Sequence, residues 1–194
     1  MGRVLLGVLL GVLIVPAAAY IWLSHGKVPV AVDDPTLPFE AQLTHVPLQK
    51  RIAKELILMP AVQPGEETYV AGAHIYAQRC AVCHGYHGRP AAIGQRMFPT
   101  APQLWEKHRN SPVVGVSDDQ PGETYWKVAN GIRLTGMPEF RTLLSDQEMW
   151  QVSVLLANAD KPLPPDALAI LHGEPAPAAK ATAPTDKPAD SGGK

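Results

Sequence analysis

The sequence predicts an all-α protein in which a helical domain follows an N-terminal apolar helix. Residues 4–23 form an apolar run of 20 residues without a charge. As a helix this run would rise about 30 Å, the thickness of the hydrocarbon core of a bilayer. Further along, residues 66–78 and 145–159 repeat apolar side chains at helical spacing. A shorter helix is predicted over residues 121–129, because Pro121 suits the first helical position.

Two local features refine these helices. Ser145 and Glu148 form the pattern of a capping box, with Ser145 as the N-cap and Glu148 three residues later. In the first of these helices, Gly72 lies on the same face as Tyr76. A glycine inside a helix costs about 1 kcal/mol relative to alanine. We therefore expect Gly72 to permit the close crossing of another helix.

The composition excludes two large classes of protein. The chain has 17 Lys and Arg against 18 Asp and Glu, a net charge of −1. A nucleic-acid binder needs a basic face to displace counterions from phosphates, so we expect no nucleic-acid partner. Two cysteines in 194 residues exclude a scaffold stapled by disulfides. No nucleophile–base pattern such as Gly-x-Ser-x-Gly occurs, so no catalytic residue is predicted.

Residues 1–24 are predicted to be a transmembrane anchor, with a cleaved signal peptide as the alternative. Tyr20 and Trp22 lie near the far end of the apolar run, where aromatic rings favour the membrane interface. Arg3 agrees with a cytoplasmic N-terminus. In the alternative, Pro16 and the three alanines after it form the cleavage region. Both interpretations export the remaining chain, which predicts a bacterial inner-membrane location with the folded domain in the periplasm.

The rest of the chain divides into three parts by composition. Residues 25–64 are rich in proline and are predicted to be an extended linker that contains a short amphipathic helix over residues 48–58. Residues 65–165 have the balanced composition of a globular domain. Residues 166–194 are rich in Ala, Pro and Lys. We predict a disordered tail there, because such a segment buries too little apolar surface to offset its ordering entropy.

Both cysteines fall in one Cys-x-x-Cys-His motif, formed by Cys80, Cys83 and His84. This motif is typical of haem c attachment. Two thiols at this spacing can add to the two vinyl groups on one edge of a porphyrin, and the following imidazole can ligate the iron. The sequence therefore predicts one covalent haem c, held by Cys80 and Cys83, with His84 as an axial ligand.

Three other interpretations of the motif fit the sequence less well. A redox dithiol is expected within a βαβ pattern, which does not surround these cysteines. A zinc site that added His84 and His87 would be crowded by the consecutive Cys83 and His84, and there is no second cysteine pair. A structural disulfide between Cys80 and Cys83 would close a strained loop. His87 is therefore expected to be a loop residue that faces solvent.

The second axial ligand is predicted to be Met137. It lies 53 residues after His84, between Gly136 and Pro138. A thioether suits iron in both oxidation states and raises the reduction potential relative to a second imidazole. Gly136 allows close approach of the backbone and Pro138 stiffens the loop. Met97 is the alternative ligand, whereas any other methionine is expected to fill the core.

In order and spacing, the chain resembles the class I c-type cytochromes, the mostly helical monohaem electron carriers. The matching positions, within residues 65–162, are Gly72, Tyr76, Cys80, Cys83, His84, Gly85, Pro102, Leu104, Trp126, Val128, Asn130, Gly131, Ile132, Gly136, Met137, Pro138 and Trp150. The resemblance implies a helical domain around one covalently bound haem, with His84 and Met137 as axial ligands. It also implies that the first and last helices cross near Gly72 and Tyr76, against Trp150 and its neighbours.

The same resemblance suggests which groups surround the ligands. Pro102 is the first candidate for a carbonyl that accepts the ring N–H of His84, and Pro90 is the second; such a bond would raise the basicity of the imidazole. Arg133, near the methionine loop, is expected to pair with a haem propionate or to remain solvated. The departure from the family pattern is a long polar stretch over residues 105–120, which would be a docking loop or a simple insertion.

The function expected from these features is electron transfer by a membrane-tethered periplasmic cytochrome c, as in a respiratory chain. Its partners would be a redox donor and a redox acceptor, with the N-terminal helix in the membrane. One alternative is a haem c subunit of a larger membrane dehydrogenase, oxidase or reductase. Another is a sensory or catalytic haem with an open sixth site, which requires that Met137 does not ligate.

Overall fold

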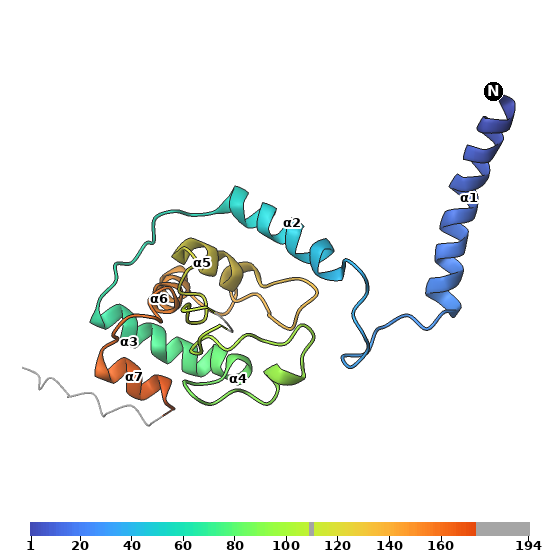
Figure 1. Ribbon diagram of the computed structural model, residues 1–194. Coiled ribbons are helices and arrows are strands. Elements are labelled where there is room, and N and C mark those ends of the chain that lie inside the picture. Colours follow the sequence, from blue (N-terminus) through green and yellow to red (C-terminus); the bar gives the residue numbers. More distant parts are fainter. Residues whose placement is uncertain (109–110, 174–194) are drawn as a thin grey trace, which may run out of the picture. The chain divides into compact units, whose positions relative to one another are not determined.

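The computed structural model describes residues 1–108 and 111–173, and all of the regular elements in this part of the chain are helices (Figure 1). The β-type pairings among these residues are two isolated bridges, Tyr86 with Arg89 and Lys107 with Val114. By its internal contacts the chain forms two units, residues 1–50 and residues 51–194. The all-helical prediction is therefore confirmed.

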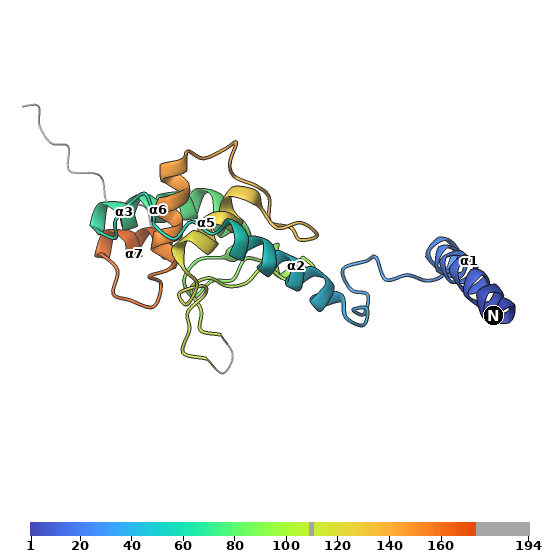
Figure 2. The same cartoon turned by 90° about the horizontal axis from the view of Figure 1, so that it is seen from above.

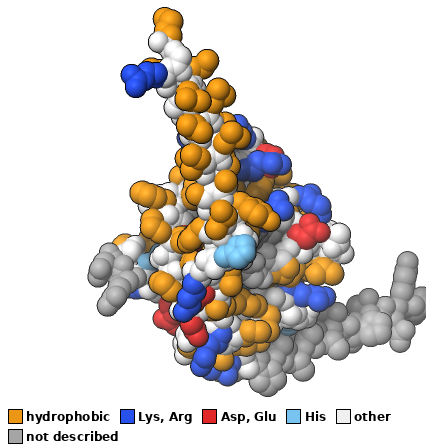
Figure 3. Space-filling model, turned by 90° about the vertical axis from the view of Figure 1, so that its right-hand side faces the viewer, with side chains coloured by type: hydrophobic (Ala, Val, Ile, Leu, Met, Phe, Trp, Pro, Cys, Tyr) orange, Lys and Arg blue, Asp and Glu red, His pale blue; other side chains and the backbone are white. Residues whose placement is uncertain are grey.

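The first unit begins with α1, Gly2–His25, which has no buried residue. Hydrophobic side chains lie along its length (Figure 3). Among the described residues it is the one helix that is long and apolar enough to cross a membrane, a test that a signal sequence would also pass. The helix contains Pro16 within its apolar run.

The next helix, α2, spans Glu40–Glu55 and differs from the prediction of a short helix over residues 48–58. It begins earlier because the Glu40 carboxylate accepts a hydrogen bond of 2.8 Å from the Leu37 backbone N–H, and an acid in the first turn favours the helix dipole. It ends earlier, at Glu55, and the residue Ile57 beyond this end packs closely on Gly122. Its last turn belongs to the second unit and buries Ile52 to 2% exposure.

One nearly continuous helical stretch enters the Cys-x-x-Cys-His motif. Helix α3, Glu66–Ile75, passes into a π-helical turn, η1, over Tyr76–Cys80, and then into α4, Ala81–His84. The backbone N–H of Ala81 bonds to the carbonyl of Tyr76, five residues earlier. The stretch ends at Gly85, whose φ of 74° is in the left-handed region that glycine adopts without strain. The predicted helix over residues 66–78 thus continues through the whole motif.

Helix α6, Asp146–Leu156, is the centre of the packing. The predicted capping box is confirmed: Ser145 is the N-cap, and the reciprocal bonds with Glu148 are both present. Helix α3 packs across α6 at Gly72, where an added Cβ would lie 2.6 Å from the Gln151 carbonyl oxygen. The expected close crossing at this glycine is therefore confirmed.

Helix α5, Pro121–Asn130, packs on α6 and leads into the Met137 loop. The Tyr125 ring in α5 stacks on Trp150 of α6, with ring centroids 4.2 Å apart. Figure 2 shows α3, α5, α6 and α7 gathered in the second unit. The core between these helices is formed by Ala73, Tyr76, Leu104, Trp105, Val128, Ala129, Phe140, Met149, Val152, Leu155, Leu156, Ala167 and Leu171.

The prediction of a disordered tail over residues 166–194 is wrong for its first residues. Residues Pro165–Leu171 form helix α7, which packs on α3 and buries Ala167, Ile170 and Leu171. These three side chains are spaced by three and four residues and so share one helical face. The prediction rested on the average composition of residues 166–194, which does not show this short apolar face. The remaining tail, residues 174–194, lies outside the described residues.

Candidate haem-attachment site

The two cysteines lie three residues apart in one helical stretch and are both free. Cys80 ends the π-helical turn η1, and Cys83 precedes His84 in α4. Burial, together with the nearby Cys83, raises the pKa of the Cys80 thiol to about 12. Cysteines of redox dithiols have lowered pKa values instead. The surroundings of Cys80 therefore favour a neutral thiol and argue against a redox dithiol.

The imidazole of His84 is held by one backbone contact. Its Nδ1 lies 2.8 Å from the carbonyl oxygen of Pro102, so Nδ1–H donates and Nε2 keeps its lone pair. Burial lowers the pKa of His84, and the bond to Pro102 opposes this shift. A neutral imidazole with a free Nε2 is the form that binds a metal. Pro90 is exposed and has no hydrogen bond to His84 within the described part of the chain.

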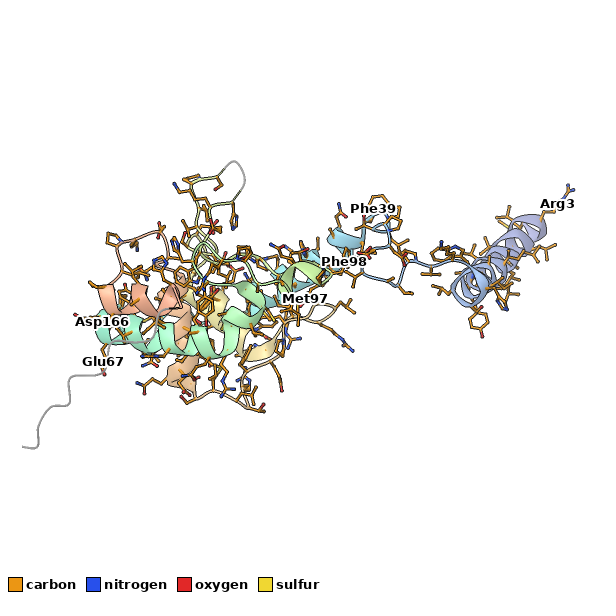
Figure 4. All side chains as sticks on the ribbon, turned by 90° about the horizontal axis from the view of Figure 1, so that it is seen from below. Arg3, Phe39, Glu67, Met97, Phe98 and Asp166 are labelled. Atoms are coloured by element: carbon orange, nitrogen blue, oxygen red, sulfur yellow. The ribbon has the colours of Figure 1, made fainter. Side chains whose placement is uncertain are left out.

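A second chain segment approaches the motif through Gly94. A Cβ at Gly94 would lie 1.9 Å from the carbonyl oxygen of Cys83, so only glycine permits this contact. Gly94 begins the short 3₁₀ helix η2, Gly94–Arg96, which is followed by Met97 and Phe98 (Figure 4). The Sδ atom of Met97 lies 2.8 Å from the position of a Cβ on Gly136. The segment after the motif thus reaches from Cys83 to the methionine loop.

The methionine loop is fixed by its own backbone. The carbonyl of Met137 accepts a bond of 3.2 Å from Ile132 N–H, and its N–H donates to Thr135 Oγ1 at 3.1 Å. Gly131, with φ of 65°, packs against the Met137 carbonyl and the two residues that follow. Met137 itself is half-buried against the core. Both candidate thioethers, Met137 and Met97, therefore belong to residues that meet at Gly136.

A comparison with protein families identifies the domain that carries the motif and the methionine loop. The family model described as "Cytochrome C oxidase, cbb3-type, subunit III" matches residues 67–156, from the first turn of α3 to the end of α6. These residues are a class I-like c-type cytochrome domain. The match includes the Cys-x-x-Cys-His motif, Pro102 and Met137 and excludes α2 and α7.

Other comparisons are limited. No match was found among curated proteins. Among solved structures, a chain of the Kuenenia stuttgartiensis reducing HAO-like protein complex Kustc0457/Kustc0458 is similar at 26% sequence identity. The similarity covers 63% of this chain and 61% of that one, with a TM-score of 0.41. The present chain therefore spans less than two thirds of the length of this relative.

The donor set of the cytochrome domain fits a covalently attached haem. Two free thiols lie three residues apart on a helical turn, and the next residue is an imidazole whose Nδ1 is already engaged. The thioether of Met97 packs on Gly136, the residue before Met137. Among the described residues no cluster of three or more His, Cys, Asp or Glu side chains could hold another metal ion. The chemistry required for haem c attachment and iron ligation is thus present in one part of the fold.

The remaining predicted residues lie at the surface. Arg133 is exposed on the turn before Met137, and His87 is exposed in the loop after the motif. The ring of His87 packs on that of His172, with centroids 4.9 Å apart. The backbone N–H of His87 also bonds to the carbonyl of Leu171. His87 therefore takes part in the contact between this loop and the end of α7, which the sequence pattern did not indicate.

Two features of the domain were missed by sequence reasoning. The first is a pair of buried donors, Gln103 Nε2 and Trp105 Nε1, which have no acceptor among the described atoms. Their alternation on either side of Leu104 was the available signal. The second is a cavity of about 160 Å³ beside α5, away from the predicted ligands. It is lined by Glu55, Ile57, Gly122, Tyr125, Trp126, Asn130 and Arg141.

Proposed function

We propose that the protein is a membrane-tethered periplasmic carrier of single electrons. Its cytochrome domain would bind one haem c through Cys80 and Cys83, with His84 and Met137 as axial ligands. Haem bound in this way accepts and releases one electron at its iron. The observation that carries the proposal is the bond between His84 Nδ1 and the Pro102 carbonyl, because it leaves Nε2 of a neutral imidazole free to ligate.

The chain's own residues would keep the geometry of the axial ligands the same in the ferrous and ferric states. Pro102 holds the tautomer and orientation of the His84 ring, and the bonds to Thr135 and Ile132 hold the loop of Met137. Ligands that are fixed before electron transfer need little rearrangement during it. In this proposal α1 and the segment that follows it act as a membrane tether, which keeps the domain at high effective concentration near partners in the same membrane.

The first experiment tests covalent attachment. Haem staining of a denaturing gel and a pyridine-haemochrome spectrum of the purified protein are expected to show one haem c per chain. Cys80→Ala and Cys83→Ala are each expected to lower covalent haem content. Absence of stained haem from the wild-type chain would refute the proposal.

The second experiment tests the axial ligands. Met137→Ala is expected to convert a low-spin spectrum to a high-spin one, whereas Met97→Leu is expected to leave it low-spin. Met149→Leu, in the core of α6, is the matched control for loss of a methionine. If Met137→Ala stays low-spin and only the double variant with Met97→Leu loses this spectrum, Met97 can replace the ligand. If Met137→Ala changes neither spectrum nor potential, the assignment of Met137 is wrong.

A second candidate function is that of a haem c subunit in a larger membrane enzyme. The matching family model is described as an oxidase subunit, and the similar solved structure is part of a complex. Mild detergent extraction followed by affinity purification of the tagged full chain tests this. Stoichiometric membrane subunits that stay bound at high salt would favour the subunit role, and a single polypeptide would favour the free carrier.

A further inference from the structure

The first turns of α2 expose large apolar side chains. Phe39, Leu43 and Val46 are 74%, 73% and 56% exposed. Leu43 and Val46 are three residues apart and so share one face of the helix. Phe39 lies one turn earlier (Figure 4), and its carbonyl accepts a hydrogen bond of 2.9 Å from the Leu43 N–H. An exposed apolar patch of this kind marks a place where a partner or a membrane binds.

The same face continues with positive charge. Lys50 and Lys54 follow Val46 at spacings of four residues, which keeps them on its side of the helix, and both are exposed. The two acids of α2 are engaged elsewhere: Glu40 accepts a hydrogen bond from a backbone N–H before the helix, and Glu55 accepts one from α5. Apolar side chains combined with cations on one face are typical of helices that lie at the surface of an anionic membrane.

The first turns of α2 have little packing that stabilises them as a helix. Ile52, in the last turn, is the buried residue of this helix. Pro47 lies inside the helix, where a proline costs about 3 kcal/mol. Isolated helices of this length are marginal in water, and most of their stability in proteins comes from an apolar face that is covered. An apolar environment around Leu43 and Val46 would supply that cover.

The preceding segment indicates which apolar environment is available. Helix α1 ends at His25, and α2 begins at Glu40. The intervening residues 26–39 span at most about 50 Å when fully extended. If α1 crosses the membrane, the start of α2 therefore stays close to the lipid headgroups. This short connection gives the exposed face of α2 a high effective concentration at the bilayer surface.

We propose that the face of α2 formed by Phe39, Leu43, Val46 and Lys50 binds the surface of the anionic bilayer that α1 enters. The three apolar side chains would lie at the boundary between headgroups and acyl chains, and the lysine ammonium groups would reach the lipid phosphates. The segment after α1 would then be a second membrane contact in addition to a tether. This inference rests on the membrane anchoring in the proposed function.

The test uses the full-length haem-loaded protein in lipid nanodiscs. One set of nanodiscs contains phosphatidylcholine alone, and the other contains equal parts of phosphatidylcholine and phosphatidylglycerol. Hydrogen–deuterium exchange of residues 40–50 is measured by mass spectrometry. Exchange is expected to be several-fold slower in the anionic nanodiscs, because lipid binding stabilises the backbone hydrogen bonds of the helix.

Variants at exposed positions separate lipid binding from folding. Leu43→Glu is expected to abolish the slower exchange in anionic nanodiscs, and Lys50→Gln is expected to reduce it. Leu143→Glu is the matched control, because it introduces the same charge at a leucine that is 58% exposed just before α6. This control is expected to retain the full protection of residues 40–50.

The outcomes distinguish this inference from the proposed function. Haem staining and carbonate washing of the membranes are done first, and a chain that carbonate removes would refute the anchor itself. In an anchored chain, equal exchange in the two lipids would overturn only the lipid contact of α2, as would full protection in Leu43→Glu or Lys50→Gln. Protection that occurs in native membranes but in neither nanodisc would assign the face to a protein partner and overturn the proposal.

Discussion

The indole nitrogen of Trp126 donates a hydrogen bond of 2.8 Å to a carboxylate oxygen of Glu55. This bond ties the end of α2 to α5, the helix that leads into the Met137 loop. One turn earlier in α5, Gly122 approaches Ile57 so closely that a Cβ would lie 1.9 Å from its carbonyl oxygen. The residues just before the matched cytochrome domain are therefore packed on it, and they do not form a free linker.

Replacement of Glu55 is expected to remove a pH-dependent part of the stability. Hydrogen bonds from Trp126 and then Arg51 hold the pKa of Glu55 below its usual value of 4.5. A carboxyl with a lowered pKa contributes stability above its unfolded-state pKa and loses it as the pH falls through the folded-state pKa. In urea unfolding, Glu55→Gln should be slightly less stable than the wild type at neutral pH, and the two should converge as the pH falls through the lowered pKa of Glu55.

The control for this titration is Glu67→Gln, which changes an exposed glutamate in the first turn of α3. This variant should show the same loss of stability at acidic pH as the wild type. A constant gap between the wild type and Glu55→Gln at every pH would show that the Trp126 bond does not depend on the charge of Glu55.

Gly72→Ala is expected to destabilise the crossing of α3 and α6. The new methyl group would meet the Gln151 carbonyl oxygen at 2.6 Å and the Leu155 Cβ at 3.0 Å. Overpacking of this kind costs about 1–3 kcal/mol, which exceeds the gain of about 1 kcal/mol from replacing a helical glycine. Gly65→Ala is the control, because nothing lies within 4 Å of its Cβ position. Equal urea midpoints for the two variants would contradict the close crossing.

Lys127→Met is expected to weaken the connection between α5 and the loop over residues 105–120. The Lys127 ammonium lies 2.8 Å from both Asp119 and Glu123, and all three side chains are about one-fifth exposed. Removal of the shared cation leaves two mostly buried carboxylates side by side, at a cost of about 1–3 kcal/mol. Calorimetry at neutral pH measures the loss, with the exposed Lys107→Met as control. A melting temperature that matches this control would mean that the ion triad does not stabilise the domain.

Leu171→Ala tests whether α7 is part of the folded domain. Leu171 is fully buried, and truncation of a buried leucine to alanine costs about 2–5 kcal/mol. Leu168→Ala, at a half-buried position of the same helix, should cost clearly less. Urea unfolding of both variants measures the difference. If both are as stable as the wild type, α7 does not contribute to the core, and the expectation of a tail from residue 166 would be restored.

Features that depend on a few neighbouring residues were predictable. The capping box at Ser145 and Glu148 begins α6 because its bonds are local. The apolar run of α1 and the Cys-x-x-Cys-His motif are likewise complete within a short stretch of sequence. The family pattern also suggested Pro102 as a partner of His84, 18 residues away, and the structure places this carbonyl 2.8 Å from Nδ1.

The sequence by itself determined the chemistry that is available: two thiols and an imidazole on one helical stretch, followed by two methionines outside the helices. Only the tertiary structure decided how far these groups are supported. The packing of Met97 on Gly136, the hydrogen bond from Trp126 to Glu55 and the packing of α7 on α3 each join residues distant in the chain. Such contacts depend on the volume and hydrogen-bonding needs that remain when the helices have packed, and no local pattern of residues encodes them.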